Sequence, residues 1–116
     1  MEQLLLLAPA RLPTLRLFRR QVMAVLHGDR FTKVGIKGQA DLYGIERGSR
    51  HVEIELKGVN TPLTPEQKAW KAFCEAWGVV YMLLRMQPGE SPEQAAQRWV
   101  GEISERMSIS ERQIPI

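Results

Sequence analysis

Residues 51–57 constrain the fold more than any other part of the chain, because apolar and polar side chains alternate through them without exception. The apolar positions are Val52, Ile54 and Leu56. Three charged residues alternate with them, Glu53, Glu55 and Lys57. Successive side chains of a strand point to opposite faces, so this period predicts a half-buried strand with one apolar face and one charged face.

The length and composition indicate one globular domain. The chain has 116 residues, of which 44% are hydrophobic and 25% charged, and this excludes a disordered tail protein or a collagen-like chain. Cys74 is the only cysteine, so no internal disulfide is possible, and a reducing compartment such as the cytoplasm is expected. No apolar run approaches the ~18 residues of a membrane span, and the run at 4–8 is too short for a signal-peptide core. We therefore expect no membrane partner.

A helix and a further strand are predicted after the alternating segment. Thr64, Pro65 and Gln67 have the spacing of an N-cap, a first helical residue and the partner of a capping box. The apolar stripe of this helix is Trp70, Phe73, Cys74 and Trp77. Gly78 is the predicted stop. The continuous apolar run at 79–84 predicts a strand covered on both faces and parallel to the alternating strand.

A second capping box, Ser-Pro-Glu-Gln at 91–94, begins the last predicted helix. The apolar stripe of this helix is Ala95, Ala96, Trp99, Val100 and Ile103. Residues 108–116 lack such a pattern. We therefore expect a single domain over 1–107 and a C-terminal tail over 108–116 that is open to fraying.

The N-terminal part predicts a short helix at 2–8 that ends at Pro9. The segments 15–26 and 31–36 are interpreted as a hairpin, because the turn signal His-Gly-Asp-Arg stands between them. A helix over 14–26 is the alternative, since several apolar residues there also have helical spacing.

A strand at 40–46 and a turn at 47–49 complete the path to the alternating strand. The expected order of elements is α-β-β-β-β-α-β-α. This order places the chain in the α/β class, with a mixed central sheet flanked by helices.

The hairpin loop before the alternating strand decides where Asp41 points. A loop over 47–49 places Asp41 opposite Glu55, and a loop over 46–48 places it opposite Glu53. A loop with an even number of residues would send Asp41 to the other face. Opposed carboxylates have Cβ atoms about 5 Å apart and repel each other, whereas a divalent cation between them is attracted by both.

Carboxylate oxygens with room for water and phosphate suit Mg²⁺ or Mn²⁺. Lys57 is one side-chain step further along the same face, where an ammonium group can activate a water molecule and neutralise charge on a phosphate. Asp41, Glu55 and Lys57 are therefore the set that metal-assisted phosphodiester hydrolysis needs. The alternative is that the Glu-x-Glu-x-Lys face is a solvated sheet surface in a plain interaction domain.

The net charge of +3 is too small to indicate a nucleic-acid partner, yet the charge is unevenly distributed. Residues 11–37 hold seven Lys and Arg residues against one acid, a local charge of +6, whereas residues 59–116 carry −1. The candidate phosphate-binding residues in the first segment are Arg19, Arg20, Lys33 and Lys37. Such a local field can attract a polyanion, and a solvated strand face rich in arginine is the alternative.

Four short motifs follow one another in an order that is specific in combination: Gly38-Gln39-Ala40-Asp41, Glu55-Leu56-Lys57, Leu63-Thr64-Pro65-Glu66-Gln67 and Gly78. In this order they resemble the VRR-NUC domain, the virus-type replication-repair nuclease group of the PD-(D/E)xK superfamily. Residues 2–85 follow the order of small stand-alone members, which are often phage-borne. The resemblance implies a restriction-endonuclease-like core.

The resemblance also implies roles for individual residues. Asp41 and Glu55 would be metal ligands, and the backbone carbonyl of Leu56 would add a third oxygen. Lys57 would be the catalytic lysine. The implied cofactor is Mg²⁺, with Mn²⁺ as a substitute.

Further residues match the family at the edges of this site. Gln67 matches a glutamine that orients Lys57 or a phosphate, and a purely structural capping role is the alternative. Glu2 matches an acidic residue of the first helix that approaches the metal in this superfamily. Arg19 and Arg20 match a basic pair that contacts the DNA backbone.

The function that the resemblance implies is a metal-dependent endodeoxyribonuclease, selective for branched DNA such as a Holliday junction or a flap. Stand-alone relatives are commonly homodimers, and a twofold dimer offers two active sites to the two strands of a junction. The implied location is the cytoplasm of a bacterial host cell, with a phage as the source. The competing function is a non-catalytic DNA-binding or regulatory module that keeps the nuclease fold.

Overall fold

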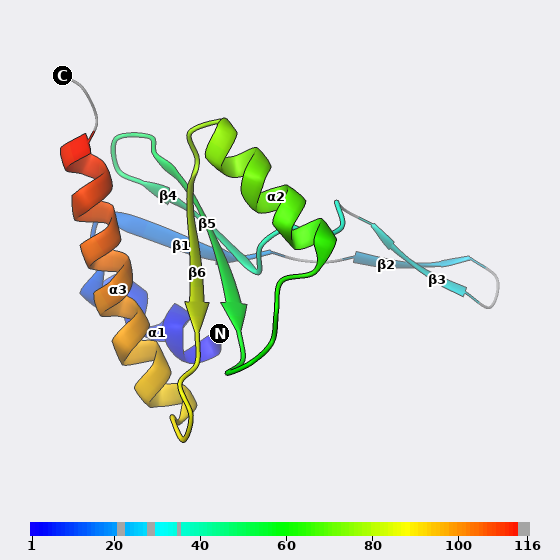
Figure 1. Ribbon diagram of the computed structural model, residues 1–116, viewed down its shortest axis with the longest axis horizontal. Helices are drawn as coiled ribbons and strands as arrows, with labels where there is room; N and C mark the ends of the chain where they lie inside the picture. The colour runs from blue at the N-terminus through cyan, green and yellow to red at the C-terminus, as the bar shows by residue number, and fades with distance from the viewer. Residues whose placement is uncertain (21–22, 28–29, 35, 114–116) are drawn as a thin grey trace.

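The structure is a computed structural model that describes residues 1–20, 23–27, 30–34 and 36–113, with the backbone alone for 23–27, 30–34 and 109–113. Three helices and six strands make up these ranges (Figure 1). In chain order they are α1 (Glu2–Arg11), β1 (Leu15–Arg19), β2 (Met23–His27), β3 (Arg30–Val34), β4 (Leu42–Glu46), β5 (His51–Lys57), α2 (Pro65–Ala76), β6 (Val80–Arg85) and α3 (Pro92–Gln113). None of the described helices combines the length and the apolar character needed to cross a membrane.

A four-stranded mixed sheet with the order β1-β4-β5-β6 forms the centre of the molecule. β4 pairs antiparallel with both β1 and β5, and β6 runs parallel to β5. The crossover from β5 to β6 passes through α2, as a parallel connection requires. The predicted α/β class and the mixed sheet flanked by helices are confirmed.

Helices cover both faces of this sheet. α1 and α3 pack on one face, where the apolar side of β5 contributes Val52 and Ile54 to the main core together with Leu4 and Trp99. α2 covers the other face, where Cys74 packs against Ala40 and Tyr81 in a smaller cluster. The charged side of β5 therefore faces a helix and not solvent.

The predicted hairpin is present between residues 23–27 and 30–34, but its first strand does not extend over 15–26, and the alternative helix over 14–26 is wrong. β1 ends at Arg19, and β2 forms a separate hairpin with β3 that projects from the body of the molecule (Figure 1). The order of elements thus has one strand more than predicted, α-β-β-β-β-β-α-β-α. The cause lies outside the local sequence: β1 can extend only as far as its partner β4, and the last backbone contact is the hydrogen bond from the Arg20 N–H to the Asp41 carbonyl.

Two predicted helix ends are also wrong. α1 continues through Pro9 to Arg11, because Leu4, Ala8 and Leu12 form a stripe that is buried in the core and holds the last turn in place. The missing N–H of proline removes one helical hydrogen bond, and this burial offsets the loss. At the C-terminus, residues 108–113 belong to α3 and do not form a tail.

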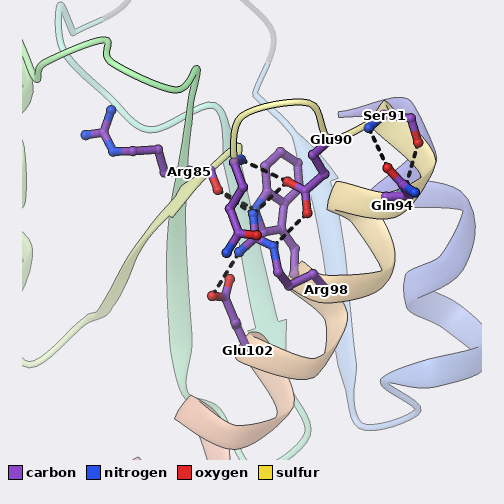
Figure 2. A network of polar contacts seen from close by, with 8 residues as sticks. Arg85, Glu90, Ser91, Gln94, Arg98 and Glu102 are labelled. Carbon is purple, nitrogen blue, oxygen red and sulfur yellow. Dashed lines mark hydrogen bonds and ion pairs between the residues drawn. The ribbon is translucent and has the colours of Figure 1, made fainter.

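The start of α3 is tied to the end of β6 by a polar network (Figure 2). The Arg98 guanidinium donates hydrogen bonds to Glu90 at 2.8 Å, to Glu102 at 3.1 Å and to the Arg85 carbonyl at 2.6 Å. Arg98 and the Gln87 N–H lower the pKa of Glu90 to about 2. The predicted capping box is confirmed, because Ser91 and Gln94 exchange hydrogen bonds between side chain and backbone.

Candidate active site

Asp41 and Glu55 lie across from each other on neighbouring strands. Leu42 of β4 pairs with Ile54 of β5, so the register places Asp41 opposite Glu55 on the side of the sheet that α2 covers. The Leu56 N–H donates a hydrogen bond to Asp41 Oδ2 at 2.9 Å, which fixes the Asp41 carboxylate against β5. The predicted turn at 47–49, and the juxtaposition that follows from its odd length, are confirmed.

The Glu55 carboxylate is almost fully buried, with 2% of the residue exposed. Gln67 Nε2 donates a hydrogen bond to Glu55 Oε1 at 3.0 Å, and Lys57 Nζ lies 3.9 Å from the same oxygen. Glu55 Oε2 has no hydrogen-bond partner among the described residues. A buried carboxylate oxygen without a donor costs free energy unless a proton or a cation compensates it.

Burial and, next, the neighbouring Asp41 carboxylate raise the pKa of Glu55 to about 7, although the Lys57 ammonium acts in the opposite direction. Both main causes disfavour a negative charge at this place. The Glu55 carboxyl therefore retains its proton to a higher pH than an ordinary glutamate, even with the Lys57 ammonium beside it.

Gln67 caps α2 and donates a hydrogen bond to Glu55 through different atoms. Its backbone N–H donates to Thr64 Oγ1 at 3.1 Å, and its Oε1 accepts from the Thr64 N–H at 2.9 Å, which completes the predicted capping box. The capping role uses the amide oxygen and leaves the amide nitrogen free to donate to Glu55. The structural and the functional interpretation of Gln67 are thus compatible.

Gly38 lets the segment before Asp41 pass directly over the start of α2. Its φ of +91° lies in the left-handed region, and a Cβ atom there would come within 2.4 Å of the Glu66 backbone. Only glycine fits this position without a backbone shift. The motif glycine therefore has a steric reason: it lets the segment that carries Asp41, just before β4, approach α2, which carries Gln67.

The Leu56 carbonyl points to the same edge of β5 as Asp41. The Lys57 carbonyl accepts a hydrogen bond from the Met86 N–H, so it points toward β6. Carbonyls of successive strand residues point to opposite edges, and the Leu56 carbonyl is therefore directed toward β4. Asp41, Glu55 and this carbonyl offer hard oxygens at one place, which suits a cation such as Mg²⁺.

Glu53 forms a second buried cluster that sequence reasoning missed. It is 1% exposed and accepts two hydrogen bonds from Arg20, at 2.7 and 2.8 Å, and one from Trp70 Nε1 at 2.9 Å. His51 Nε2 lies 2.6 Å from Glu53 Oε2, the carboxylate oxygen that Trp70 does not contact. Because Glu53 and Glu55 are both buried beneath α2, the alternative of a solvated Glu-x-Glu-x-Lys face is wrong.

The candidate DNA-binding residues do not share one environment: Arg20 is paired within the fold, whereas Arg19 and Lys37 are exposed. The Arg20 guanidinium is engaged by Glu53, so it joins β1 to β5 within the fold. Arg19 lies 3.6 Å from Glu2, and Lys37 lies 3.4 Å from Glu66 at the exposed start of α2. The side chain of Lys33 lies outside the described residues.

Glu2 is not brought to Asp41 and Glu55. Its exposed carboxylate pairs with Arg19, and no group of three His, Cys, Asp or Glu side chains gathers into a metal site in the part of the chain that is described. The oxygen donors at the candidate site are thus two carboxylates and a backbone carbonyl.

The predicted apolar stripe of α2 is core only in part. Cys74 is buried and Trp70 half-buried, but Phe73 is 49% and Trp77 74% exposed. The Phe73 ring contacts Trp70 and Trp77, with ring centroids 5.4 and 5.8 Å apart, so the three rings follow one another along α2 from a half-buried position to an exposed one. In contrast, Trp99 of α3 is buried, as predicted.

The chain matches no protein-family model, and comparison with curated proteins and with solved structures gave no match.

Proposed function

We propose that the protein is a metal-dependent endodeoxyribonuclease with a restriction-endonuclease-like core of the PD-(D/E)xK type, similar to VRR-NUC domains. The observation that carries this proposal is the pairing of the half-buried Asp41 with the buried Glu55, with Lys57 beside them and one Glu55 oxygen unpartnered among the described residues. A structural ion pair would have matched each carboxylate with a cation. This site instead brings two carboxyl groups together beside one ammonium group, and a divalent cation would replace the proton that the raised pKa of Glu55 retains.

The arrangement of elements supports the same assignment. The candidate aspartate directly precedes β4, and the Glu-x-Lys motif ends the antiparallel neighbour β5. α2 follows and brings Gln67 onto Glu55. Three of the four motifs on which the resemblance rests, those that contain Asp41, Glu55 and Gln67, therefore have positions from which they can contribute to one site.

The roles of the residues follow from their chemistry. Asp41, Glu55 and the Leu56 carbonyl would hold Mg²⁺ or Mn²⁺. When bound, such an ion stabilises negative charge on a phosphate and lowers the pKa of water. Gln67 keeps the Glu55 carboxylate in one orientation by donating to Oε1.

Lys57 supplies a positive charge from the protein itself beside Glu55. Its side chain is only 10% exposed, so its ammonium is held at the Glu55 oxygen and does not move freely in solvent. From there it can orient a water molecule by hydrogen bonding and reduce the negative charge that develops on a phosphodiester. Lys57 is therefore the residue whose loss should affect catalysis most and binding least.

The proposed substrate is branched DNA, a Holliday junction or a flap, in the cytoplasm of a bacterial host. Exposed cations such as Arg19 and Lys37 would contact phosphates, and binding should weaken as salt increases. The opposing Glu2 and Glu66 carboxylates are also exposed and are readily displaced by a polyanion.

The test is cleavage of duplex, flap, Holliday-junction and single-stranded DNA of equal length, each with Mg²⁺, Mn²⁺ or EDTA. We expect metal-dependent cleavage of at least one branched substrate. Lys57→Ala should reduce the cleavage rate at least ~100-fold, the usual size of a lost acid–base or charge-stabilising group, with DNA affinity within twofold. Lys68→Ala removes an exposed lysine from α2 and is the matched control, which should cleave normally.

Absence of cleavage by the natural sequence with either metal would refute the nuclease proposal. If binding to branched DNA persists under those conditions, the non-catalytic DNA-binding module is the function. Equal losses of binding and cleavage in Lys57→Ala would show that Lys57 is a phosphate contact and not a catalytic residue.

A further inference from the structure

Three aromatic rings, those of Phe18, Tyr43 and His51, form a stacked row across β1, β4 and β5. Phe18 lies directly opposite Tyr43, with ring centroids 5.3 Å apart. His51 lies diagonally across from Tyr43, at 6.4 Å and with its ring plane 7° from parallel. Tyr43 is also opposite Glu53, which Trp70 of α2 contacts, so this aromatic row lies on the side of the sheet that carries the candidate site.

The two ends of the aromatic row are open to solvent. Phe18 is 41% exposed and the His51 side chain 46%. Ile45, on the same face of β4 as Tyr43, is exposed beside them. α2 therefore does not cover this side of its sheet face. A contiguous apolar patch of this kind, bordered by charged residues, indicates an interaction surface.

The Arg20 guanidinium holds the middle of the aromatic row in place. It lies 5.0 Å from the centroid of the Tyr43 ring, a cation–π distance, and both of its terminal nitrogens donate to the buried Glu53. Because Arg20 is itself fixed by Glu53, it keeps the Tyr43 ring in one orientation, and the outer two rings stack against that ring. Side chains that are ordered before binding lose little conformational entropy when a ligand stacks on them.

The charge around the aromatic row suits an anionic ligand. The acid that lies beneath the row, Glu53, is neutralised by its ion pair with Arg20. Arg16, two residues before Phe18 on the same face of β1, is exposed. Aromatic rings beside accessible cations are the means by which sheet surfaces bind single-stranded nucleic acid, because the bases stack on the rings and the phosphates contact the cations.

The aromatic row begins next to the candidate metal ligands. Tyr43 follows Asp41 by two residues, and Glu53 precedes Glu55 by two residues on β5. Two residues of a strand span about 7 Å, and a strand of duplex DNA advances about 3.4 Å per nucleotide. A base on the row therefore belongs to a nucleotide about two to three positions from a phosphate held at Asp41 and Glu55.

We propose that the aromatic row is a base-stacking site for unpaired DNA, in which the Phe18 ring at its outer end stacks on a base near the phosphate at the candidate site. The inference rests on the proposed nuclease function, because that function places the DNA strand at Asp41 and Glu55. It also gives a reason for selecting branched DNA. A flap or an opened junction exposes unpaired bases, whereas a base in an intact duplex must first be unstacked.

The test is a mutant cycle between Phe18 and the base, measured as DNA affinity and not as cleavage. The probe is a fluorescein-labelled flap with a single-stranded arm, in EDTA, together with a series of the same DNA in which one arm nucleotide at a time is abasic. Phe18→Leu keeps an apolar side chain without the ring and should weaken binding at least roughly fivefold, the lower end of one base–aromatic stack. One abasic position should weaken binding of the natural sequence by a similar factor and leave binding of Phe18→Leu unchanged.

Two further variants isolate the ring. Phe18→Tyr keeps an aromatic ring and should bind within about twofold of the natural sequence. Phe73→Leu is the matched control, because it makes the same change at a similarly exposed ring of α2 outside the aromatic row. It should bind normally and keep the sensitivity to the abasic position.

An equal loss of affinity in Phe73→Leu overturns the proposal, as does a Phe18→Leu variant that responds to every abasic position as the natural sequence does. A change in the self-association of Phe18→Leu with DNA affinity intact would assign the ring to a second copy of the chain and overturn the proposal as well.

Failure of the base-stacking site and failure of the nuclease function give different results. Metal-dependent cleavage of branched DNA together with a failed cycle overturns the base-stacking site alone. A working cycle in a protein that cleaves no DNA with Mg²⁺ or Mn²⁺ overturns the nuclease function alone and leaves a binding site for unpaired bases.

Discussion

Ionisation of the buried Glu55 is the main way in which the candidate site lowers the stability of the folded chain. A carboxylate with a raised pKa holds its proton more tightly in the folded chain than in the unfolded chain, whose pKa is near the ordinary 4.5. Its contribution to stability is therefore largest below pH 4.5. It declines as the pH rises from 4.5 to about 7, because the folded state must then ionise a buried group beside Asp41.

Glu55→Gln should remove this decline, because glutamine cannot ionise. In EDTA, the free energy of unfolding of the variant relative to the natural sequence should increase by about 2–3 kcal/mol between pH 4.5 and pH 8, at ~1.4 kcal/mol per unit of pKa shift. Urea denaturation at several pH values in this range measures the difference. A constant difference across the range would mean that Glu55 is not held at a raised pKa.

Glu53 and Glu55 show how two residues of one strand face can have opposite electrostatic environments. Glu53 is matched by Arg20 and by the Trp70 N–H, whereas Glu55 shares its place with another carboxylate. The alternating sequence predicted that both lie on one face, and a predicted helix was available to cover it. The sequence did not show that Arg20, 33 residues away, would pair with Glu53, because that contact depends on the register between β1 and β4.

The N-terminus of α2 contributes both a helix cap and a hydrogen bond to the candidate site. Mutations can separate these two contributions. Thr64→Ala removes the cap acceptor for the Gln67 N–H but leaves the Gln67 amide nitrogen on Glu55. It should lower the free energy of unfolding by about 1 kcal/mol, the usual value of an N-cap, with the cleavage rate unchanged well below the melting temperature. Gln67→Ala should lower stability by a similar amount and also reduce cleavage at least tenfold.

Thermal melting and cleavage kinetics on the same preparations give the comparison. Equal activity of the two variants would leave Gln67 with a capping role alone. A loss of activity in Thr64→Ala equal to that in Gln67→Ala would mean that the position of the whole helix, and not the amide donor, controls the site.

Elements with strong local signals were predicted correctly from the sequence, and those defined by distant partners were not. α2, β5 and the start of α3 carry capping boxes or strict alternation, and each begins where predicted. The break between β1 and β2 depends on where β4 begins, and the continuation of α1 through Pro9 depends on a core that α3 completes. The exposure of Phe73 and Trp77 has the same origin, because helical spacing identifies a stripe without indicating how much sheet lies beneath it.

The molecule as a whole consists of a layered body and one projecting arm, the β2–β3 hairpin. The arm extends along the longest dimension of the protein, which measures 52 Å (Figure 1). It belongs to the basic stretch of residues 11–37, and two of the seven bases of that stretch, Arg30 and Lys33, are in β3. An isolated two-stranded hairpin adds little stability to a domain, so we expect the arm to contribute to binding and not to folding.

Replacing residues 23–34 by a short Gly-Ser linker should leave the body folded, because Met23 pairs with Val34 and a short linker can join the two ends of the arm. The melting temperature should stay within about 4 °C, which corresponds to ~1 kcal/mol or less. Affinity for branched DNA should fall, and the salt dependence of log Kd should become shallower by about 1–2, since two cations are lost. The variant Arg30→Ser/Lys33→Ser keeps the arm with Asp29 and removes the same two cations, so fluorescence-anisotropy titrations of both variants at several salt concentrations separate the effect of these cations from that of the rest of the arm. Unchanged affinity and salt dependence in both variants would exclude the arm from the DNA interface and leave binding to the cations of the body.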